Sequence, residues 1–406
     1  MRVMLLGDMP PCRNFTAGLV LEQLLPCFAS HELSAAVVVD PSLDPQPRDL
    51  IPEDRILRLT KPRESRKEWL RRPKVLGEFS ARMFELGQAK KVRELLLPQI
   101  VAFGKNFGVE KIWLTLQGQT MVRLARPVAD ALGVPMCAQI WDPFGWWLRA
   151  NRIDRRSSKE LTLEFDKVIL RCESVAAASW SMADRYKEKY GVRAIPVIPG
   201  ISDDLIKHPL ASGDNDGDFV IGMAGQLYAM AEWKRLLEAL SLLKWRVGNR
   251  NVRIRVFGKH FDMHTSERVN CEFLGWRDQS EVVQLLSNSD LNFIPYWFDQ
   301  AFREETENSF PSKMSTYCAA AKPVLVHAPS YATPTSFVQK HDIGYVVTNP
   351  SAAELAQTIS EALSNLEERK RKAVKAAACF TNYLSTSCMR RSFKDFLGLD
   401  SQSQNH

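Results

Sequence analysis

Short apolar runs alternate with longer amphipathic stretches along almost the whole chain. Each apolar run has the length of a buried β-strand, and each stretch between two runs is long enough for a crossover helix. The pattern therefore predicts βα units and parallel sheets. The predicted strands lie at 3–6, 35–39, 112–116, 136–140, 175–179, 194–198, 219–225, 252–258, 271–274, 291–295 and 323–326.

One stretch interrupts this rhythm and predicts a linker. Residues 202–218 are rich in Asp, Gly, Asn, Pro and Ser and contain few apolar residues. We therefore expect an α/β protein with two Rossmann-like, doubly wound domains at 1–205 and 206–378. Residues 379–406 are expected to form a helix, around 380–397, that packs back on the first domain, followed by a polar tail. Residues 40–60 and the Pro-rich segment 10–18 are predicted as loops, and a helix as starting at Leu19.

Composition excludes several classes of protein. The 406 residues are 45% hydrophobic and 25% charged, which is typical of a globular chain and not of a disordered or fibrous one. No apolar run approaches the roughly 20 residues that span a bilayer, and the first apolar stretch is too short for a signal peptide. We therefore expect a cytoplasmic protein. The eight cysteines form no C-x-x-C pair, which favours reduced thiols over a zinc or disulfide framework.

The formal net charge is +7, a mild excess that lacks the dense basic stripe of a nucleic-acid binder. No nucleic-acid partner is therefore expected, whereas a phosphate-bearing ligand is compatible. Basic residues gather at Lys61, Arg63, Arg66, Lys67, Arg71, Arg72 and Lys74. They suggest a peripheral contact with an anionic membrane, although a solvated loop and helix explains them equally well. No histidine or cysteine cluster has metal-ligand spacing, so no metal site is expected.

The segment 308–325 carries the strongest chemical signal. It predicts a loop, a helix capped by Ser309 or Ser312 with Pro311 in its first turn, and a strand. The helix start and Lys313 together would attract an anion. An ordinary capped helix is the alternative. Neither G-x-G-x-x-G nor a Walker A loop follows a predicted strand, so dinucleotide and P-loop enzymes are not indicated.

The same segment, Pro311-Ser312-Lys313-Met314 followed by Tyr317, alanines and Lys-Pro-Val, resembles retaining GT-B glycosyltransferases of the family 4 type. Gly225-Gln226-Leu227 with Lys234, Val256-Phe257-Gly258 and Phe273-Leu274-Gly275 are similar to further motifs of that family, in the same order. The resemblance implies two domains facing across a cleft and a hexosyltransferase that uses a nucleotide sugar as donor and a saccharide or lipid-linked acceptor. It also implies retention of configuration, with no metal and no cofactor. The donor-binding residues that it implies are Gly225, Gln226, Lys234, Asn308, Ser312, Lys313 and Thr316.

Three of these positions depart from the family pattern. Thr316 and Asn308 stand where the family has two glutamates eight residues apart, and Gln226 replaces an arginine that binds the diphosphate. Charge-assisted hydrogen bonds are about twice as strong as neutral ones, so these changes weaken the expected site. A divergent transferase, a sugar-nucleotide epimerase or hydrolase, and a non-catalytic nucleotide-sugar or partner-binding protein all remain open.

Two acidic residues and one loop are the remaining candidates for catalysis and for binding the substrates. Asp142 lies in the Trp-rich run 141–147 after a predicted strand and could hold sugar hydroxyls. Glu307 lies in the acidic run before the anion-binding helix, where the donor hexose is expected. Both are predicted to be catalytic, against the alternatives of an aromatic cluster and a solvated charged face. The small-residue loop with Asn14, Thr16, Ala17 and Gly18 is predicted to approach the acceptor or the donor phosphate.

Overall fold

The computed structural model describes residues 1–64, 74–209, 217–258 and 270–399 of the chain. These form two compact units. The first comprises Met1–Val197 together with the chain from Arg390 onward, and the second comprises Ile198–Met389. The sequence predicted the changes of domain at 205/206 and at 378/379.

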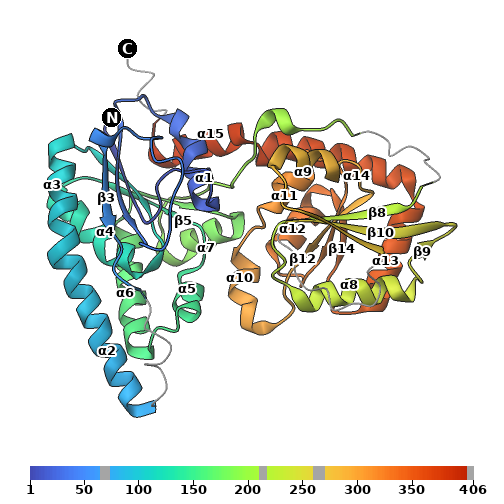
Figure 1. The fold of residues 1–406 in the computed structure, drawn as a ribbon, viewed down its shortest axis with the longest axis horizontal. Helices are drawn as coiled ribbons and strands as arrows, with labels where there is room; N and C mark the ends of the chain where they lie inside the picture. The colour runs from blue at the N-terminus through green and yellow to red at the C-terminus, as the bar shows by residue number, and fades with distance from the viewer. Residues whose placement is uncertain (65–73, 210–216, 259–269, 400–406) are drawn as a thin grey trace. The chain divides into compact units, whose positions relative to one another are not determined.

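The first unit is built on a parallel sheet of seven strands in the order β3-β2-β1-β4-β5-β6-β7 (Figure 1). The order reverses direction beside β1, as in doubly wound folds, whose ligands bind at the carboxyl ends of the strands. The strands are β1 Val3–Gly7, β2 Leu33–Val39, β3 Ile56–Thr60, β4 Lys111–Thr115, β5 Met136–Ile140, β6 Ser174–Ala177 and β7 Ala194–Pro196. The helices are α1 Thr16–Leu24, α2 Lys74–Lys91, α3 Leu97–Phe107, α4 Gly118–Leu132, α5 Phe144–Ala150, α6 Arg155–Arg171 and α7 Trp180–Tyr190; a π-helical turn, η4 Val92–Leu96, joins α2 to α3.

The second unit contains a sheet in the order β11-β10-β8-β12-β13-β14, in which all neighbours are parallel, and the short β9 pairs antiparallel with β10. Its strands are β8 Phe219–Ala224, β9 Arg246–Val247, β10 Arg250–Phe257, β11 Cys271–Gly275, β12 Leu291–Pro295, β13 Val324–His327 and β14 Gly344–Val347. The helices are α8 Met230–Leu242, α9 Gln279–Leu286, α10 Arg303–Asn308, α11 Lys313–Ala319, α12 Thr333–His341, α13 Ala352–Ser364 and α14 Leu366–Cys379, with a 3-10 turn, η7, at Gln300–Phe302.

The last helix, α15 at Thr386–Leu397, carries the chain back to the first unit. Arg390 Nε donates a hydrogen bond to the Gln23 carbonyl at 2.7 Å. Ser174 Oγ donates to the Phe396 carbonyl at 2.6 Å. The Phe393 ring packs edge-on against the buried Trp113 ring, with centroids 4.7 Å apart.

Strands buried on both faces explain why the apolar runs are nearly continuous. All five residues of β1, β4, β5 and β12 are buried. The eight cysteines are free thiols. In the part of the chain that is described, no helix combines the length and the apolarity needed to cross a membrane.

Several elements differ from the sequence prediction, among them the short β9, which was not predicted. The segment predicted as loop at 40–60 contains the edge strand β3, and β14 was not predicted. Helix α1 begins at Thr16 rather than at Leu19. Thr16, Ala17 and Gly18 therefore belong to a helical turn and not to a loop, because the chain closes its first helical hydrogen bond, from Leu19 N to the Phe15 carbonyl, at 2.9 Å.

Candidate functional site

The turn after β8 lies at the carboxyl edge of the second sheet. Gly225 has φ +81°, a conformation that side-chain-bearing residues rarely adopt, and its N–H donates to the Phe257 carbonyl at 2.8 Å. A Cβ added at Gly225 would lie 3.7 Å from Lys313 Cε. Gly225 and Gln226 are exposed. The glycine therefore gives the chain a sharp, open turn directly against the Lys313 side chain.

Lys313 is the central charged group of this edge. It is the first residue of α11 and only 9% exposed. Its Nζ donates to the Gln226 carbonyl at 2.9 Å and lies 4.7 Å from the centre of the Tyr228 ring. Burial lowers the pKa of Lys313 to about 7 because the charged ammonium loses water. Since an ammonium has three donors, Nζ keeps capacity for an anion beside this carbonyl.

Tyr317 fixes α11 to the sheet. Its buried hydroxyl accepts a hydrogen bond from Ala224 N at 2.8 Å and donates to the Phe293 carbonyl at 3.2 Å. These two bonds join the last residue of β8 and the middle of β12 to one helix. Lys313 lies one turn earlier on the same helix, so it is held at the carboxyl edge of the sheet.

The helix itself contributes less than the sequence suggested. It has seven residues, and Ser312 makes no side-chain cap hydrogen bond. A short helix carries a weak dipole at its N-terminus, so Lys313 is the main source of positive charge. Ser312 is exposed and Thr316 is buried, both beside Lys313 on this element. The structure thus brings Gly225, Gln226 and Lys313 together, and Ser312 and Thr316 lie directly before and one turn after Lys313 in the chain.

The residues of α10 are engaged with one another. Glu307 forms an ion pair with Arg303, with Oε1 and Nε 2.7 Å apart. The buried Asn308 donates from Nδ2 to the Glu304 carbonyl at 2.7 Å. Both side chains thus stabilise α10.

Lys234 was predicted to bind the donor together with Lys313. It lies on α8 and is exposed. Its neighbours Glu232 and Arg235 on the same helix form a hydrogen bond: the buried Glu232 accepts from Arg235 Nη1 at 2.8 Å. Glu232 also accepts from Phe298 N at 3.2 Å.

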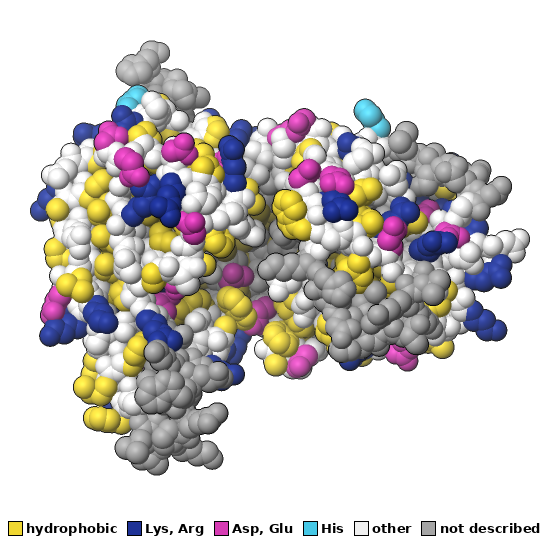
Figure 2. All heavy atoms as spheres, viewed as in Figure 1, with side chains coloured by type: hydrophobic (Ala, Val, Ile, Leu, Met, Phe, Trp, Pro, Cys, Tyr) yellow, Lys and Arg dark blue, Asp and Glu magenta, His cyan; other side chains and the backbone are white. Residues whose placement is uncertain are grey.

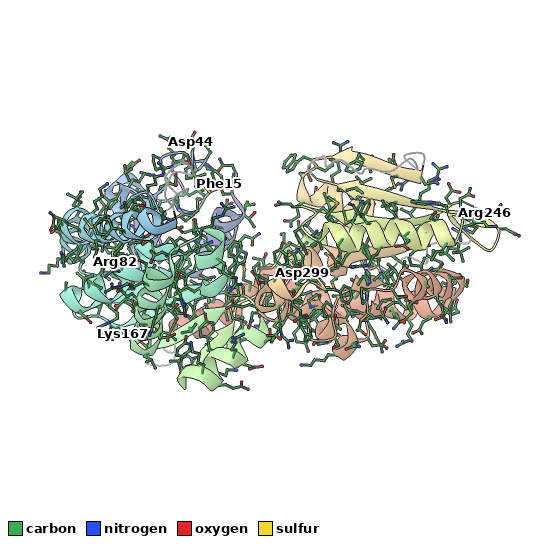
Figure 3. All side chains as sticks on the ribbon, turned by 90° about the horizontal axis from the view of Figure 1, so that it is seen from below. Phe15, Asp44, Arg82, Lys167, Arg246 and Asp299 are labelled. Carbon is green, nitrogen blue, oxygen red and sulfur yellow. The ribbon has the colours of Figure 1, made fainter. Side chains whose placement is uncertain are left out.

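Sequence reasoning missed an aromatic cluster next to Lys313. The Tyr228 ring lies 4.9 Å from Trp297, and Trp297 Nε1 donates to the Tyr228 carbonyl at 3.1 Å. Trp297 also stacks on Phe302, with centroids 5.0 Å apart and planes 15° apart. Asp299, labelled in Figure 3, caps the turn between them by accepting from Ala301 N at 2.9 Å. The run Tyr296-Trp297-Phe298 directly after a strand was the signal that could have revealed this cluster.

In the first unit, Asn14 has a structural role. Its Nδ2 donates to the Asp44 carbonyl at 2.7 Å, and its Oδ1 accepts from Gln46 N at 2.8 Å. Figure 3 shows the neighbouring Phe15 near Asp44 at one end of this unit. Gly18 is required for packing, since a Cβ there would lie 2.0 Å from Cys12 Sγ.

A cavity of about 250 Å³ lies beside this loop. It extends from the carboxyl ends of β2 and β3 to the segment that Asn14 holds, and its lining includes Pro41, Leu43, Pro47, Ile51 and Leu59. The lining is largely apolar. Asp142 belongs to the same unit, where it follows β5 and is exposed.

The part of the chain that the structure describes contains no group of three or more His, Cys, Asp and Glu that could hold a metal ion. Residues 65–73, which carry most of the predicted basic membrane contact, lie outside the described residues.

Comparison with known proteins supports these observations. Residues 207–378 match the family model described as glycosyl transferases group 1. No curated protein matches the chain in sequence.

Solved structures match over nearly the full length. The Anabaena protein HepE in complex with UDP is 14% identical, with a TM-score of 0.67 over 99% of this chain and 100% of that one. Sucrose-phosphate synthase from Thermosynechococcus elongatus is 11% identical, with a TM-score of 0.66 over 99% and 100%. A glycosyltransferase from Rickettsia africae is 15% identical, with a TM-score of 0.62 over 98% and 99%. The chain therefore has the GT-B fold predicted from its motifs, and within it residues 207–378 match the glycosyl transferases group 1 family model.

Proposed function

We propose that this protein transfers a hexose from a nucleoside diphosphate sugar to a saccharide or lipid-linked acceptor, with retention and without a metal ion. The observation that carries the proposal is the buried Lys313 ammonium beside the exposed turn Gly225-Gln226. A leaving diphosphate gains negative charge as the glycosidic bond breaks. A preorganised cation in a dry site stabilises that charge more than the same cation in water would.

The burial of Lys313 is proposed to make donor binding depend on pH. Burial lowers the pKa of Lys313 to about 7, and a bound diphosphate would raise this pKa by favouring the charged form. Donor binding is then accompanied by proton uptake and weakens as pH rises above 7. Gln226, Lys234, Ser312, Asn308 and Thr316 are proposed to contribute hydrogen bonds or charge to the same donor.

The aromatic cluster and the acids would position the sugar. Tyr228, Trp297 and Phe302 offer ring faces next to Lys313, and such faces pack against sugar or base rings. Glu307 is proposed to act on the donor hexose, which requires its ion pair with Arg303 to open when the donor binds. Asp142 is proposed to hold acceptor hydroxyls in the first unit. The apolar cavity there suits an acceptor with an apolar portion.

Isothermal titration against UDP, GDP and ADP, with and without Mg²⁺, tests the donor site. Wild type should bind one of these nucleotides without metal. At a ligand concentration 100 times Kd, this binding should raise the free energy of unfolding by about 2.7 kcal/mol. Lys313→Met should lose this binding, whereas Lys340→Met, at an exposed position on α12, should keep it. The proposed donor site would be wrong if wild type bound none of the nucleotides. It would also be wrong if Lys313→Met bound a nucleotide as wild type does.

The altered positions favour a second candidate, a nucleotide-sugar-binding protein without turnover. Asn308 donates to a backbone carbonyl of its own helix, and Thr316 provides no carboxylate. Release of free nucleotide from the bound sugar donor, measured in a single turnover with an acceptor panel, separates the two candidates. Thr316→Glu would place a carboxylate one turn after Lys313 and should tighten donor binding if the family's ribose position is retained.

A further inference from the structure

Helix α2 has its polar and apolar faces reversed relative to an ordinary surface helix. The positions buried against the rest of the first unit are Ala81, Glu85 and Gln88, and Val92 continues this face into η4. Their spacing of four, three and four residues defines one side of a helix. Among residues 79–91, the part of α2 whose side chains are described, two of the three buried side chains are therefore polar, where a soluble helix normally presents apolar residues.

Polar contacts hold this inward face. Gln119 Nε2 donates to Glu85 Oε1 at 3.4 Å, and Arg123 Nη2 lies 3.5 Å from Glu85 Oε2, both from α4. Arg82 pairs with Glu160 on α6. Polar contacts to α4 and α6 thus contribute to the attachment of α2, and the exposed side of the helix takes no part in them.

The outward face is nevertheless apolar. Phe79, Met83 and Leu86 are 69%, 54% and 47% exposed, and they lie at intervals of four and three residues on one side of α2. Figure 2 shows hydrophobic side chains along the outer edge of this helix, at the lower left of the view. Scattered exposed apolar residues are normal, whereas a continuous stripe of large ones marks an interaction surface.

The net charge of the protein arises in the stretch of sequence that leads into this helix and includes it. Residues 61–93 contain 11 Lys and Arg against four Asp and Glu, so their excess equals the +7 of the whole chain, and the remainder is balanced. Within the described part of this segment, Lys90, Lys91 and Arg93 are exposed and follow the stripe by one to two turns. A helix with large apolar residues outward and basic residues beside them has the chemistry of an interfacial membrane helix.

We propose that the outward face of α2, formed by Phe79, Met83 and Leu86 with Lys90, Lys91 and Arg93, binds the surface of an anionic lipid bilayer. The apolar side chains would enter the boundary between headgroups and acyl chains, and the basic ones would meet anionic headgroups. A second copy of the chain fits this face less well, because the exposed Lys91 and Arg93 of two copies would repel one another.

Flotation of the full chain with vesicles tests the surface without any nucleotide, so its result is independent of the proposed sugar transfer. Binding to phosphatidylcholine vesicles that include phosphatidylserine should exceed binding to phosphatidylcholine alone. Lys90→Gln with Lys91→Gln should lower the partition coefficient by about fivefold for each lysine. Phe79→Ser with Met83→Ser and Leu86→Ser should lower it by more than about tenfold.

Matched control variants replace exposed residues of the same types at positions away from α2. Leu242→Ser with Val374→Ser replaces two exposed apolar residues of the second unit, and Lys105→Gln with Lys340→Gln replaces two exposed lysines. Both should bind vesicles like wild type, and circular dichroism verifies that every variant is folded. Equal wild-type binding to neutral and anionic vesicles, no binding, or unchanged binding of the α2 variants would overturn the proposal. The proposal would also be overturned if wild type were a dimer that bound no vesicles and the triple serine variant were a monomer.

Discussion

Replacing Lys313 by Met should make the protein more stable while removing its donor site. Methionine has nearly the same length and no charge, so it fills the same space without requiring hydration. Burial lowers the pKa of Lys313 from 10.5 to about 7 in the folded chain. The unfolded chain therefore holds a proton between these pH values that the folded chain releases, and this difference disfavours folding.

The magnitude follows from the pKa difference. Each unit corresponds to 1.36 kcal/mol, so at pH 7 the buried lysine costs about 4 kcal/mol. The Met variant also loses the hydrogen bond to the Gln226 carbonyl and the contact with the Tyr228 ring, which together stabilise by about 2 kcal/mol. The expected net gain is about 2 kcal/mol at pH 7.

Scanning calorimetry measures this gain. For a unit of this size, about 2 kcal/mol raises Tm by about 4–8 °C. The cost of Lys313 is fully present below pH 7 and is removed as pH rises toward 10.5. Between pH 7 and pH 9, the free energy of unfolding of wild type should therefore rise by about 2 kcal/mol more than that of Lys313→Met. The exposed Lys340→Met should stay within about 0.5 kcal/mol of wild type.

Two results would refute the reasoning. The first is a Lys313→Met variant that melts below wild type at pH 7. The second is a wild type and variant whose stabilities change in parallel between pH 7 and pH 9. Either would mean that Lys313 stays charged and well solvated in the folded chain, and its suitability for a diphosphate would then rest on exposure and not on a dry site.

Three further predictions concern the frame of the site. Tyr317→Phe should lower the free energy of unfolding by about 1–3 kcal/mol, because Ala224 N–H loses its buried acceptor; urea titration measures the loss. Gly225→Ala and Gly248→Ala should each cost roughly 1–2 kcal/mol, since both residues have positive φ, but only Gly225→Ala should weaken nucleotide binding in calorimetry. Burial lowers the pKa of His327 to about 4, so the fold should lose about 3 kcal/mol as pH falls from 6.5 to 4; acid titration of His327→Gln should show a flatter profile over that interval, and a profile parallel to wild type would contradict the prediction.

Local pattern predicted most of the framework. Strands such as Val3–Gly7 and Leu291–Pro295 are continuous apolar runs buried on both faces, and such runs are recognisable without neighbours. Strand β3 was missed because its residues, Ile56–Thr60, include an arginine and it lies at the sheet edge, where one side needs no apolar cover. The start of α1 was missed because Thr16 begins the helix without a side-chain cap.

The candidate site divides in the same way. The residue types of the segment 308–325 determined that a lysine stands at the start of a helix after a loop, and this information is local. Its pairing with the Gln226 carbonyl, 87 residues away, and the Tyr317 bond to Ala224 N, 93 residues away, depend on the order of strands in the sheet. Sequence also suggested Ser312 as a cap, but the cap bond is not formed.

The same distinction holds for α2. The sequence by itself determined the basic stretch from Lys61 to Lys74, because charge is a property of the residues themselves. Only the tertiary structure decided that Glu85 and Gln88 are buried while Phe79 and Met83 are exposed, and Gln119 and Arg123 of a distant helix supply the partners of Glu85. Burial and its consequences for pKa and exposure arise from contacts between segments far apart in the chain, and no local pattern contains them.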